Sequence, residues 1–348
     1  MGMLISGVSD FFGLDIGTTA MRIVQLSGSG PAKTLVKYGF IPIDSKLSQS
    51  EAKSDQQKLL TILQDLLAQA QINTRNVVVG IPSQRVFTTV ADFDRLAPGE
   101  LAKTIKFQAE SLIPTPIGES TLDWAQIGDS PVDKNKIEVL LTSVSNDFVE
   151  KRLDMLESIG LNVIVFEPDS FALSRALLAT DATSPQMIID IGNLNTDLVI
   201  AMNGAPRLTR SIPTGGDAII KAAMQGLNID QKQAEQFVLK FGLSKDKLEG
   251  QIHQAIIGTV DLLIADIDKS IKFFQKRYGE NLKLDRVIVT GAASALPEFP
   301  LYIANKFGVS VEIGNAWRNV AFAPERQNEL LALSNHFGVA VGLAERNE

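Results

Sequence analysis

The chain has 348 residues, of which 45% are hydrophobic and 21% charged, with a formal net charge of −7, two histidines and no cysteine. This length allows a large core in two domains or two lobes of one unit, and the missing cysteines exclude disulfides, thiolate metal sites and cysteine nucleophiles. The absence of cysteine and a start unlike a signal peptide predict a cytoplasmic protein. The negative net charge argues against nucleic acid as a partner. No stretch of the sequence is apolar enough to predict a membrane span.

The first elements alternate between strand and helix. FGLDIGTTAMRIVQL, at 12–26, predicts a strand ending at Asp15, a glycine turn with two hydroxyls, and a second strand. A strand is expected at 35–40, a helix with apolar positions between 59 and 70, and another strand at 76–81. This alternation indicates an α/β fold.

Residues 85–145 have a different pattern, which predicts a small inserted α+β unit. It contains VFTTVADF, the helical run ELAKTIKFQAESLI, and the strand-like LDWAQI and KIEVLLTSV, and its polar run at 126–136 predicts an exposed loop. We then expect a helix from about Asn146 to Gly160, a strand at 162–166 and a helix opened by Pro168.

The second half is expected to begin near Ser184. MIIDIGNLNTDLVIAM, at 187–202, precedes Asn203-Gly204, a strong hairpin signal, and the strand APRLTRSI. Residues 216–278 predict helices almost throughout. The chain then returns to strand at 286–291, followed by a helix, the strand VSVEI and a final helix.

The two halves share one plan. Aligning Asp15 with Asp190 superposes Asp-Ile-Gly on Asp-Ile-Gly and one hairpin on another. The glycines and the Thr18 and Thr19 hydroxyls suit phosphate oxygens, but an aspartate repels phosphate unless a cation lies between them. Mg²⁺ commonly uses one or two carboxylates, several waters and substrate phosphates, so Asp15 and Asp190 facing each other predict a site for a Mg²⁺-polyphosphate. The alternative is that Asp-Ile-Gly is a common tripeptide in which the aspartate caps a turn.

These stretches resemble the actin-like ATPases, the superfamily of actin, DnaK-type chaperones, FtsA and the sugar kinases. FGLDIGTTAMR and IIDIGNLNTDLVI resemble its two phosphate loops, VFEPDSFALSRAL a connecting helix, PTGGDAIIKAAM the entry to a helical subdomain, and DRVIVTGAASALPEF the adenosine motif. The resemblance implies an α/β fold of two lobes, each with a mixed β-sheet and flanking helices, and an FtsA-type α+β subdomain inserted in the first lobe. The expected boundaries are 1–84 and 146–184 for the first-lobe core, 85–145 for the inserted subdomain, 185–215 and 280–348 for the second-lobe core, and 216–279 for its helical subdomain.

The resemblance also implies a set of site residues. Nucleotide contacts would come from Asp15, Gly17, Thr18, Thr19 and Arg22 in the first turn, from Asp190, Gly192 and Thr196 in the second, and from Gly215, Gly216, Glu235, Gly291 and Ala292 around the sugar and base. Asp15 and Asp190 would hold the metal through water, and Glu167 would join them in organising the metal and its waters.

Within the superfamily the chain is most similar to the PilM family of type IV pilus assembly. LAPGELAKTIKFQAESLIPTPIGESTLDW resembles that family's inserted subdomain, and HFGVAVGLAER ends without the membrane helix of FtsA. Three positions depart from the superfamily: Arg22 replaces a lysine, Val238 replaces a lysine expected to face the adenosine, and Ala292 follows Gly291 where a second glycine is usual. An arginine keeps the charge with a wider fork. The other two changes predict loose nucleotide binding.

The resemblance implies an ATP- and Mg²⁺-binding scaffold whose partner is the cytoplasmic tail of a PilN-type inner-membrane protein, with contacts to the pilus motor ATPases. An alternative is an ATP-dependent kinase of a sugar-type substrate, which needs an acidic general base near the acceptor hydroxyl. The sequence contains no acid in a comparable polar, glycine-rich pocket stretch. A second alternative is an FtsA-like division protein. Hydrolysis, expected to be weak at most, and self-association are open at this point.

Overall fold

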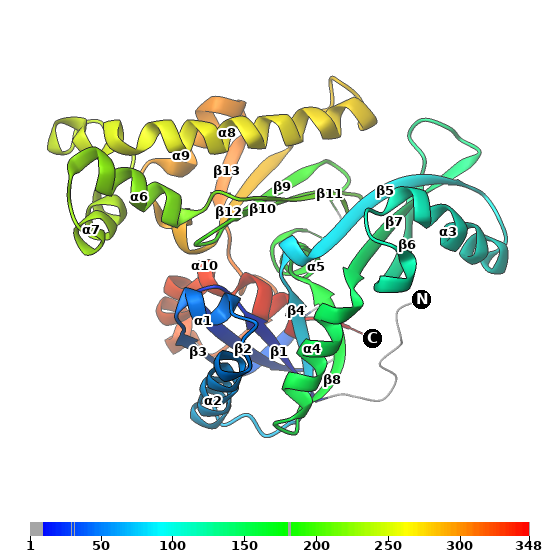
Figure 1. Cartoon of the computed structure of the whole chain (residues 1–348). Helices are drawn as coiled ribbons and strands as arrows, with labels where there is room; N and C mark the ends of the chain where they lie inside the picture. The colour runs from blue at the N-terminus through cyan, green and yellow to red at the C-terminus, as the bar shows by residue number, and fades with distance from the viewer. Residues whose placement is uncertain (1–9, 29, 31, 180–181, 348) are drawn as a thin grey trace.

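The computed structural model describes residues 10–28, 30, 32–179 and 182–347. Residues 1–9, at the start of the expected first lobe, lie outside it. The chain forms two large sheets and one small sheet (Figure 1).

The first sheet has the strand order β14-β3-β2-β1-β4-β8. Its strands are β1 (Phe12–Ile16), β2 (Ala20–Ser27), β3 (Lys33–Pro42), β4 (Asn76–Ile81), β8 (Asn162–Pro168) and β14 (Val320–Ala321). The helices that flank it in sequence are α1 (Ser45–Gln49), α2 (Lys53–Gln69), α4 (Asn146–Glu157) and α5 (Asp169–Leu177). α2 buries Leu59, Leu63 and Leu66 together with strand residues such as Phe12 and Val77, as its apolar spacing predicts.

The second sheet has the order β11-β10-β9-β12-β13. Its strands are β9 (Gln186–Ile191), β10 (Thr196–Met202), β11 (Ala205–Ile212), β12 (Arg286–Thr290) and β13 (Ser310–Ile313). The helices on this side are α6 (Gly216–Leu227), α7 (Gln231–Phe241), α8 (Gln251–Tyr278) and α9 (Phe299–Phe307). α8 runs across the top of the molecule in Figure 1.

The duplication predicted from the sequence is confirmed by the strand pairing. β1 pairs antiparallel with β2 and parallel with β4, and β9 pairs antiparallel with β10 and parallel with β12. The outer strands repeat the pattern: β3 and β11 are antiparallel to their neighbours, and β8 and β13 are parallel to theirs. Each half is therefore the same five-stranded unit, with β14 added to the first.

Two helices lie between these units. α5 and α10 (Gln327–Ala344) share one core with residues of both sheets, including Val24, Val78, Ile188 and Ile288. A Cβ on Gly342 of α10 would lie 1.9 Å from the Ala172 carbonyl oxygen of α5, so only glycine allows the two helices to approach this closely.

The end of the chain differs from the expected second-lobe boundary. We expected 280–348 to belong to the second-lobe core, but β14 pairs with β3 of the first sheet and α10 packs between the sheets. The reason is that α10 is apolar on most sides, with ten buried residues, and so requires cover from both lobes.

The third sheet lies beside the first lobe and has the order β5-β7-β6. It contains β5 (Val86–Asp94), β6 (Ser120–Asp129) and β7 (Lys136–Ser145), and α3 (Pro98–Leu112) buries Leu101 and Ile105 against it. The loop expected at 126–136 is shorter than predicted, because β6 continues to Asp129 through a register shift between Gln126 and Gly128. Polar residues on an edge strand concealed this extension in the sequence.

Among the described helices, none is both long and apolar enough to cross a membrane.

Candidate functional site

Two turns of the same construction face one cleft. The Gly17 amide donates to the Ala20 carbonyl at 3.1 Å, and the Gly192 amide donates to the Asn195 carbonyl at 2.9 Å. In the first unit Asp15 pairs across the strands with Arg22, and in the second Asp190 pairs with Asp197. The two units therefore place an aspartate at the same position, but the residue opposite it is a cation in one and an acid in the other.

Neighbouring elements hold each turn in place. In the first turn the Thr18 carbonyl accepts from the Ser48 hydroxyl at 2.8 Å, and the Thr19 carbonyl accepts from the Ile43 amide at 2.9 Å. In the second the Gly192 carbonyl accepts from the Gly216 amide at 2.9 Å. A Cβ on Gly215 would lie 2.6 Å from the Asn193 carbonyl oxygen, so this glycine permits α6 to begin against the turn.

The cleft has a volume of about 890 Å³ and is lined by both lobes. The predicted residues in its wall are Asp15, Gly17, Thr18, Thr19, Arg22, Asp190, Gly192, Gly291 and Ala292. Residues of the first unit, the second unit and the adenosine-like stretch thus come together around one space, and α10 adds Asn335 and His336.

Four predicted nucleotide contacts do not reach this wall. Thr196 is fully buried, and its hydroxyl donates to the Thr214 carbonyl at 2.7 Å. Gly215 and Gly216 support the second turn from behind, and the Glu235 carboxylate accepts from the Gln231 side chain within α7 at 2.9 Å. Val238, where we expected the adenosine-facing position, is buried in the second-lobe core.

Glu167 is also directed away from the cleft. Its carboxylate, only 4% exposed, forms ion pairs with Arg175 and with Arg346, the latter at 3.1 Å. The cleft wall instead contains Asp169, two residues further on. The expected role of Glu167 beside the metal is therefore not supported by its position, because β8 ends and α5 begins between these two acids and turns their side chains apart.

The sequence analysis missed Asp169 and Asp197. Asp169 directly follows the Glu-Pro pair, which was the one available signal, and Asp197 stands at the position equivalent to Arg22 in the first unit. Pairing the strands in register was needed to see that Asp197 faces the same cleft.

Burial raises the pKa of Asp15, Asp169, Asp190 and Asp197 in the wall. Burial, followed by Asp197 and Asp15, raises the pKa of Asp190 to about 7, although Arg22 acts in the opposite direction. Burial also raises the pKa of Asp15, against the Arg22 guanidinium at 3.0 Å. The pKa of Asp169 is raised well above its usual value by burial and then by Asp15, Asp197, Asp190 and Glu167. Burial is the largest cause of each shift, and the neighbouring acids add to it at Asp190 and Asp169.

Gly291 fixes the place of Asp190. Its φ is +88°, and a Cβ there would lie 2.3 Å from Asp190 Oδ1. This glycine lets the backbone pass directly against the Asp190 carboxylate. From the sequence, Gly291 was expected only beside the sugar and base.

The acidic wall contains a carboxylate oxygen that the protein leaves without a hydrogen bond. Within the described ranges no group of three or more His, Asp or Glu side chains could hold a metal ion. Asp169 Oδ1, however, is buried and accepts no hydrogen bond from the protein. An acceptor in that state suits a water molecule carried by Mg²⁺.

A family model and a solved structure both relate this chain to proteins of type IV pilus assembly. A family model described as type IV pilus assembly protein PilM matches residues 13–348. In a solved PilM–PilN type IV pilus biogenesis complex, one chain is 25% identical with a TM-score of 0.81, over 96% of this chain and 97% of that one. MreB5 of Spiroplasma citri bound to AMPPNP is 14% identical with a TM-score of 0.54, over 96% and 95% of the two chains.

A curated relative points to the same fold. Cell division protein FtsA of Buchnera aphidicola subsp. Baizongia pistaciae is 24% identical over 363 residues, which cover 88% of this chain and 84% of that protein. The expected actin-like fold is confirmed by these similarities together with the repeated sheet.

Proposed function

Because the chain belongs to the family of type IV pilus assembly proteins PilM, we propose that it is an ATP-binding scaffold of the pilus inner-membrane platform. The observation that carries this proposal is the pair of equivalent turns, each preceded by an aspartate, that face one cleft between the lobes. In the proposal the cleft holds ATP with Mg²⁺, and the inserted subdomain grips the cytoplasmic tail of a PilN-type membrane protein and links it to the pilus motor.

The residues of the cleft suit a Mg²⁺-nucleotide. The backbone amides and hydroxyls of Thr18 and Thr19 would donate to phosphate oxygens, and Arg22 would add a cation beside them. Mg²⁺ would neutralise the phosphates against Asp15 and Asp190, whose carboxylates would hold its waters. MreB5, which shares the fold, was solved with AMPPNP, in support of a nucleotide here.

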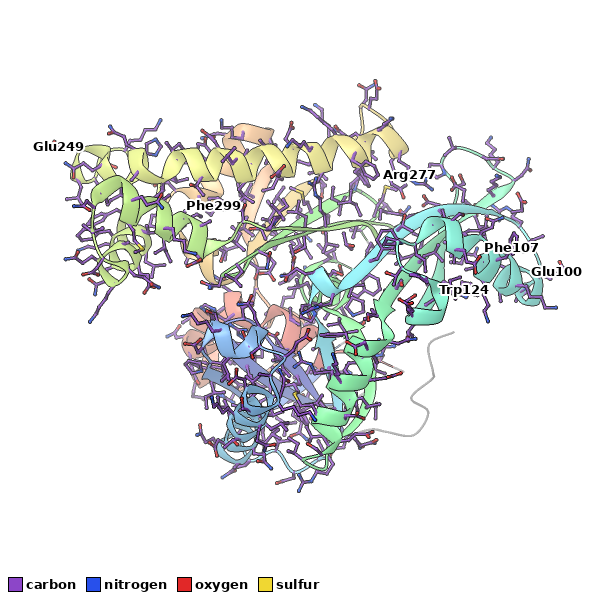
Figure 2. All side chains as sticks on the ribbon, in the orientation of Figure 1. Glu100, Phe107, Trp124, Glu249, Arg277 and Phe299 are labelled. Carbon is purple, nitrogen blue, oxygen red and sulfur yellow. The ribbon has the colours of Figure 1, made fainter. Side chains whose placement is uncertain are left out.

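The tail is proposed to bind the inserted subdomain and the adjoining surface of the first lobe. A similar chain was solved in a complex with PilN. Phe107 of α3 is 81% exposed, and Figure 2 shows it on the outer side of this subdomain. A partner anchored in the membrane would keep the protein at the inner membrane.

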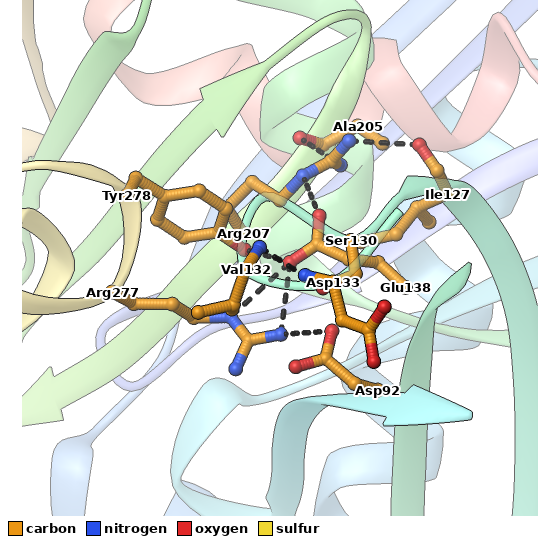
Figure 3. A network of polar contacts seen from close by, with 10 residues as sticks. All are labelled: Asp92, Ile127, Ser130, Val132, Asp133, Glu138, Ala205, Arg207, Arg277 and Tyr278. Carbon is orange, nitrogen blue, oxygen red and sulfur yellow. Dashed lines mark hydrogen bonds and ion pairs between the residues drawn. The ribbon is translucent and has the colours of Figure 1, made fainter. Parts of the chain in front are cut away.

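A buried polar network offers a route between the tail and the cleft. Glu138 of β7, 1% exposed, forms ion pairs with Arg207 of β11 at 3.1 Å and with Arg277 of α8 at 3.0 Å (Figure 3). The Tyr278 hydroxyl donates to the same carboxylate at 2.8 Å, and Arg277 also contacts Asp92 of β5 at 2.8 Å. The inserted subdomain is thus fastened to the second lobe, so that a change in the lobe arrangement would reach it.

The experiment is a fluorescence anisotropy titration of the full chain against a labelled N-terminal peptide of its PilN-type partner, with a scrambled peptide as control. We expect specific binding and an affinity that changes when Mg²⁺-ATP is added, because nucleotide and tail favour one lobe arrangement. A tail that binds no better than the scrambled peptide would contradict the scaffold proposal. An affinity unaffected by Mg²⁺-ATP would remove the coupling alone.

A further inference from the structure

A second part of the cleft wall is basic. Arg85, at the end of the short 3₁₀ turn η1 (Ser83–Arg85), and Arg152 of α4 line the same cavity as the acidic residues. Their guanidinium carbons each lie 5.5 Å from the centre of the Phe148 ring. One aromatic ring therefore holds two arginines in place in the wall, a contact that favours cations.

Arg152 has no acceptor for part of its guanidinium. Its Nη1 atom is buried and forms no hydrogen bond with the protein. Burial and the neighbouring Arg85 lower the pKa of Arg152, and the acid that acts against them is Asp169. A buried guanidinium nitrogen without an acceptor is costly, which indicates a group arranged for a ligand.

The cations next to Arg152 are already paired. Lys151 forms ion pairs with Asp147 at 2.8 Å and with Glu51 at 3.7 Å, and Arg85 forms a looser one with Glu51 at 3.7 Å. All of these side chains are more than half exposed, so the pairs are weak and easily exchanged. Arg152 therefore keeps one guanidinium nitrogen without an acceptor, although Asp169 acts on its charge, and the exposed side chain of Arg85 can exchange its weak pair to turn toward it.

We infer that Arg85 and Arg152 form a binding site for a small oxyanion such as inorganic phosphate, in a part of the cleft wall separate from the Mg²⁺-nucleotide turns. A tetrahedral oxyanion can accept hydrogen bonds from two guanidinium groups at once. This site needs no metal, because its own cations supply the charge. The inference goes beyond the proposed function and does not depend on nucleotide binding.

The test is a ³¹P NMR titration of inorganic phosphate with the full-length protein, without Mg²⁺ or nucleotide and at constant ionic strength set with chloride. We expect broadening of the phosphate resonance that sulfate reverses, and an affinity roughly tenfold weaker in Arg152→Gln, since a charged donor is lost. Arg85→Gln, a substitution at a half-exposed side chain, tests the site independently if Arg152→Gln does not fold.

Two control variants separate this site from its neighbours in the cleft. Lys151→Gln removes an adjacent cation that is already paired and should leave the affinity within about twofold. Asp190→Ala removes a carboxylate of the proposed nucleotide site and should not weaken phosphate binding, which distinguishes the two sites. The inference is overturned if wild-type protein causes no broadening, if Arg152→Gln and Arg85→Gln bind as wild type does, or if Lys151→Gln weakens binding as much as they do.

Discussion

Arg22 and Asp197 occupy equivalent positions in the two units and carry opposite charges. Burial raises the pKa of Asp15, and Arg22 acts against that rise. At Asp190, Asp197 acts in the same direction as burial, and together they raise the pKa to about 7. The first turn therefore carries a cation opposite its aspartate, and the second carries another acid. Because its pKa is about 7, Asp190 would change its charge near neutral pH when a cation binds.

Mg²⁺-ATP affinity should rise with pH across this pKa. Asp190 must lose its proton to attract the cation, so the affinity should increase from one pH unit below to one unit above about 7, by at most about tenfold per unit. The same shift has the opposite effect on the ligand-free fold. Its carboxyl stays protonated in the folded state up to about 7, whereas the unfolded chain loses that proton near the ordinary value of 3.8. This group's contribution to stability therefore falls as pH rises from about 4 to about 7 and stays constant above that.

Calorimetric titrations of the wild type and of Asp190→Asn at each pH measure this dependence. The nucleotide's own protonation cancels in the ratio of the two affinities. That ratio should grow as pH rises. A constant ratio would show that Asp190 does not titrate against the metal.

At the scale of elements, the contact between α5 and α10 depends on glycine. Gly342→Ala places a methyl group 1.9 Å from the Ala172 carbonyl oxygen and forces the helices apart. We expect a loss of about 2 kcal/mol in the free energy of unfolding, measured by chemical denaturation. Gly258→Ala is the matched control, because a Cβ there meets nothing within 4 Å and alanine favours the helix by up to about 1 kcal/mol. Equal effects of the two substitutions would contradict the packing account.

The elements also show how far the sequence could be interpreted. The strands at 76–81 and 286–291 and the hairpin at Asn203-Gly204 were predictable, because apolar runs bounded by turn residues have few alternatives. The position of α10 between the two sheets was not predictable, because a helix that is apolar on most sides does not indicate which lobe covers it. The sequence predicted Glu167 in the cleft, where the structure has Asp169. The difference depends on where β8 ends and α5 begins, and the boundaries of elements are the part of a pattern that is hardest to predict.

At the scale of the whole molecule, the Glu138 network joins three parts of the chain. Glu138→Gln leaves Arg207, 6% exposed, without its countercharge, and we expect a loss of about 3 kcal/mol in stability. Asp129→Asn in the same subdomain breaks only the exposed pair with Arg95 at 2.6 Å and should cost less than about 1 kcal/mol. Hydrogen exchange should increase along β7 and β11 in the first variant and not in the second. Similar exchange in both variants would show that the network does not hold the subdomain.

The same variant tests coupling. If the network transmits the lobe arrangement, the tail affinity of Glu138→Gln should no longer respond to Mg²⁺-ATP, while both ligands still bind. The anisotropy titration with and without nucleotide measures this response directly. A response as large as that of the wild type would place the coupling elsewhere.

The central claim is that the two turns clamp one Mg²⁺-nucleotide, and calorimetric titration of the full chain with Mg²⁺-ATP tests it most directly. The account predicts saturable binding by the wild type, loss of that binding in Asp190→Ala, and no change in Asp266→Ala, a surface aspartate of α8 paired with Lys269. No binding by the wild type, or equal binding by Asp190→Ala, would contradict the clamp and leave the actin-like fold as a peptide-binding scaffold alone.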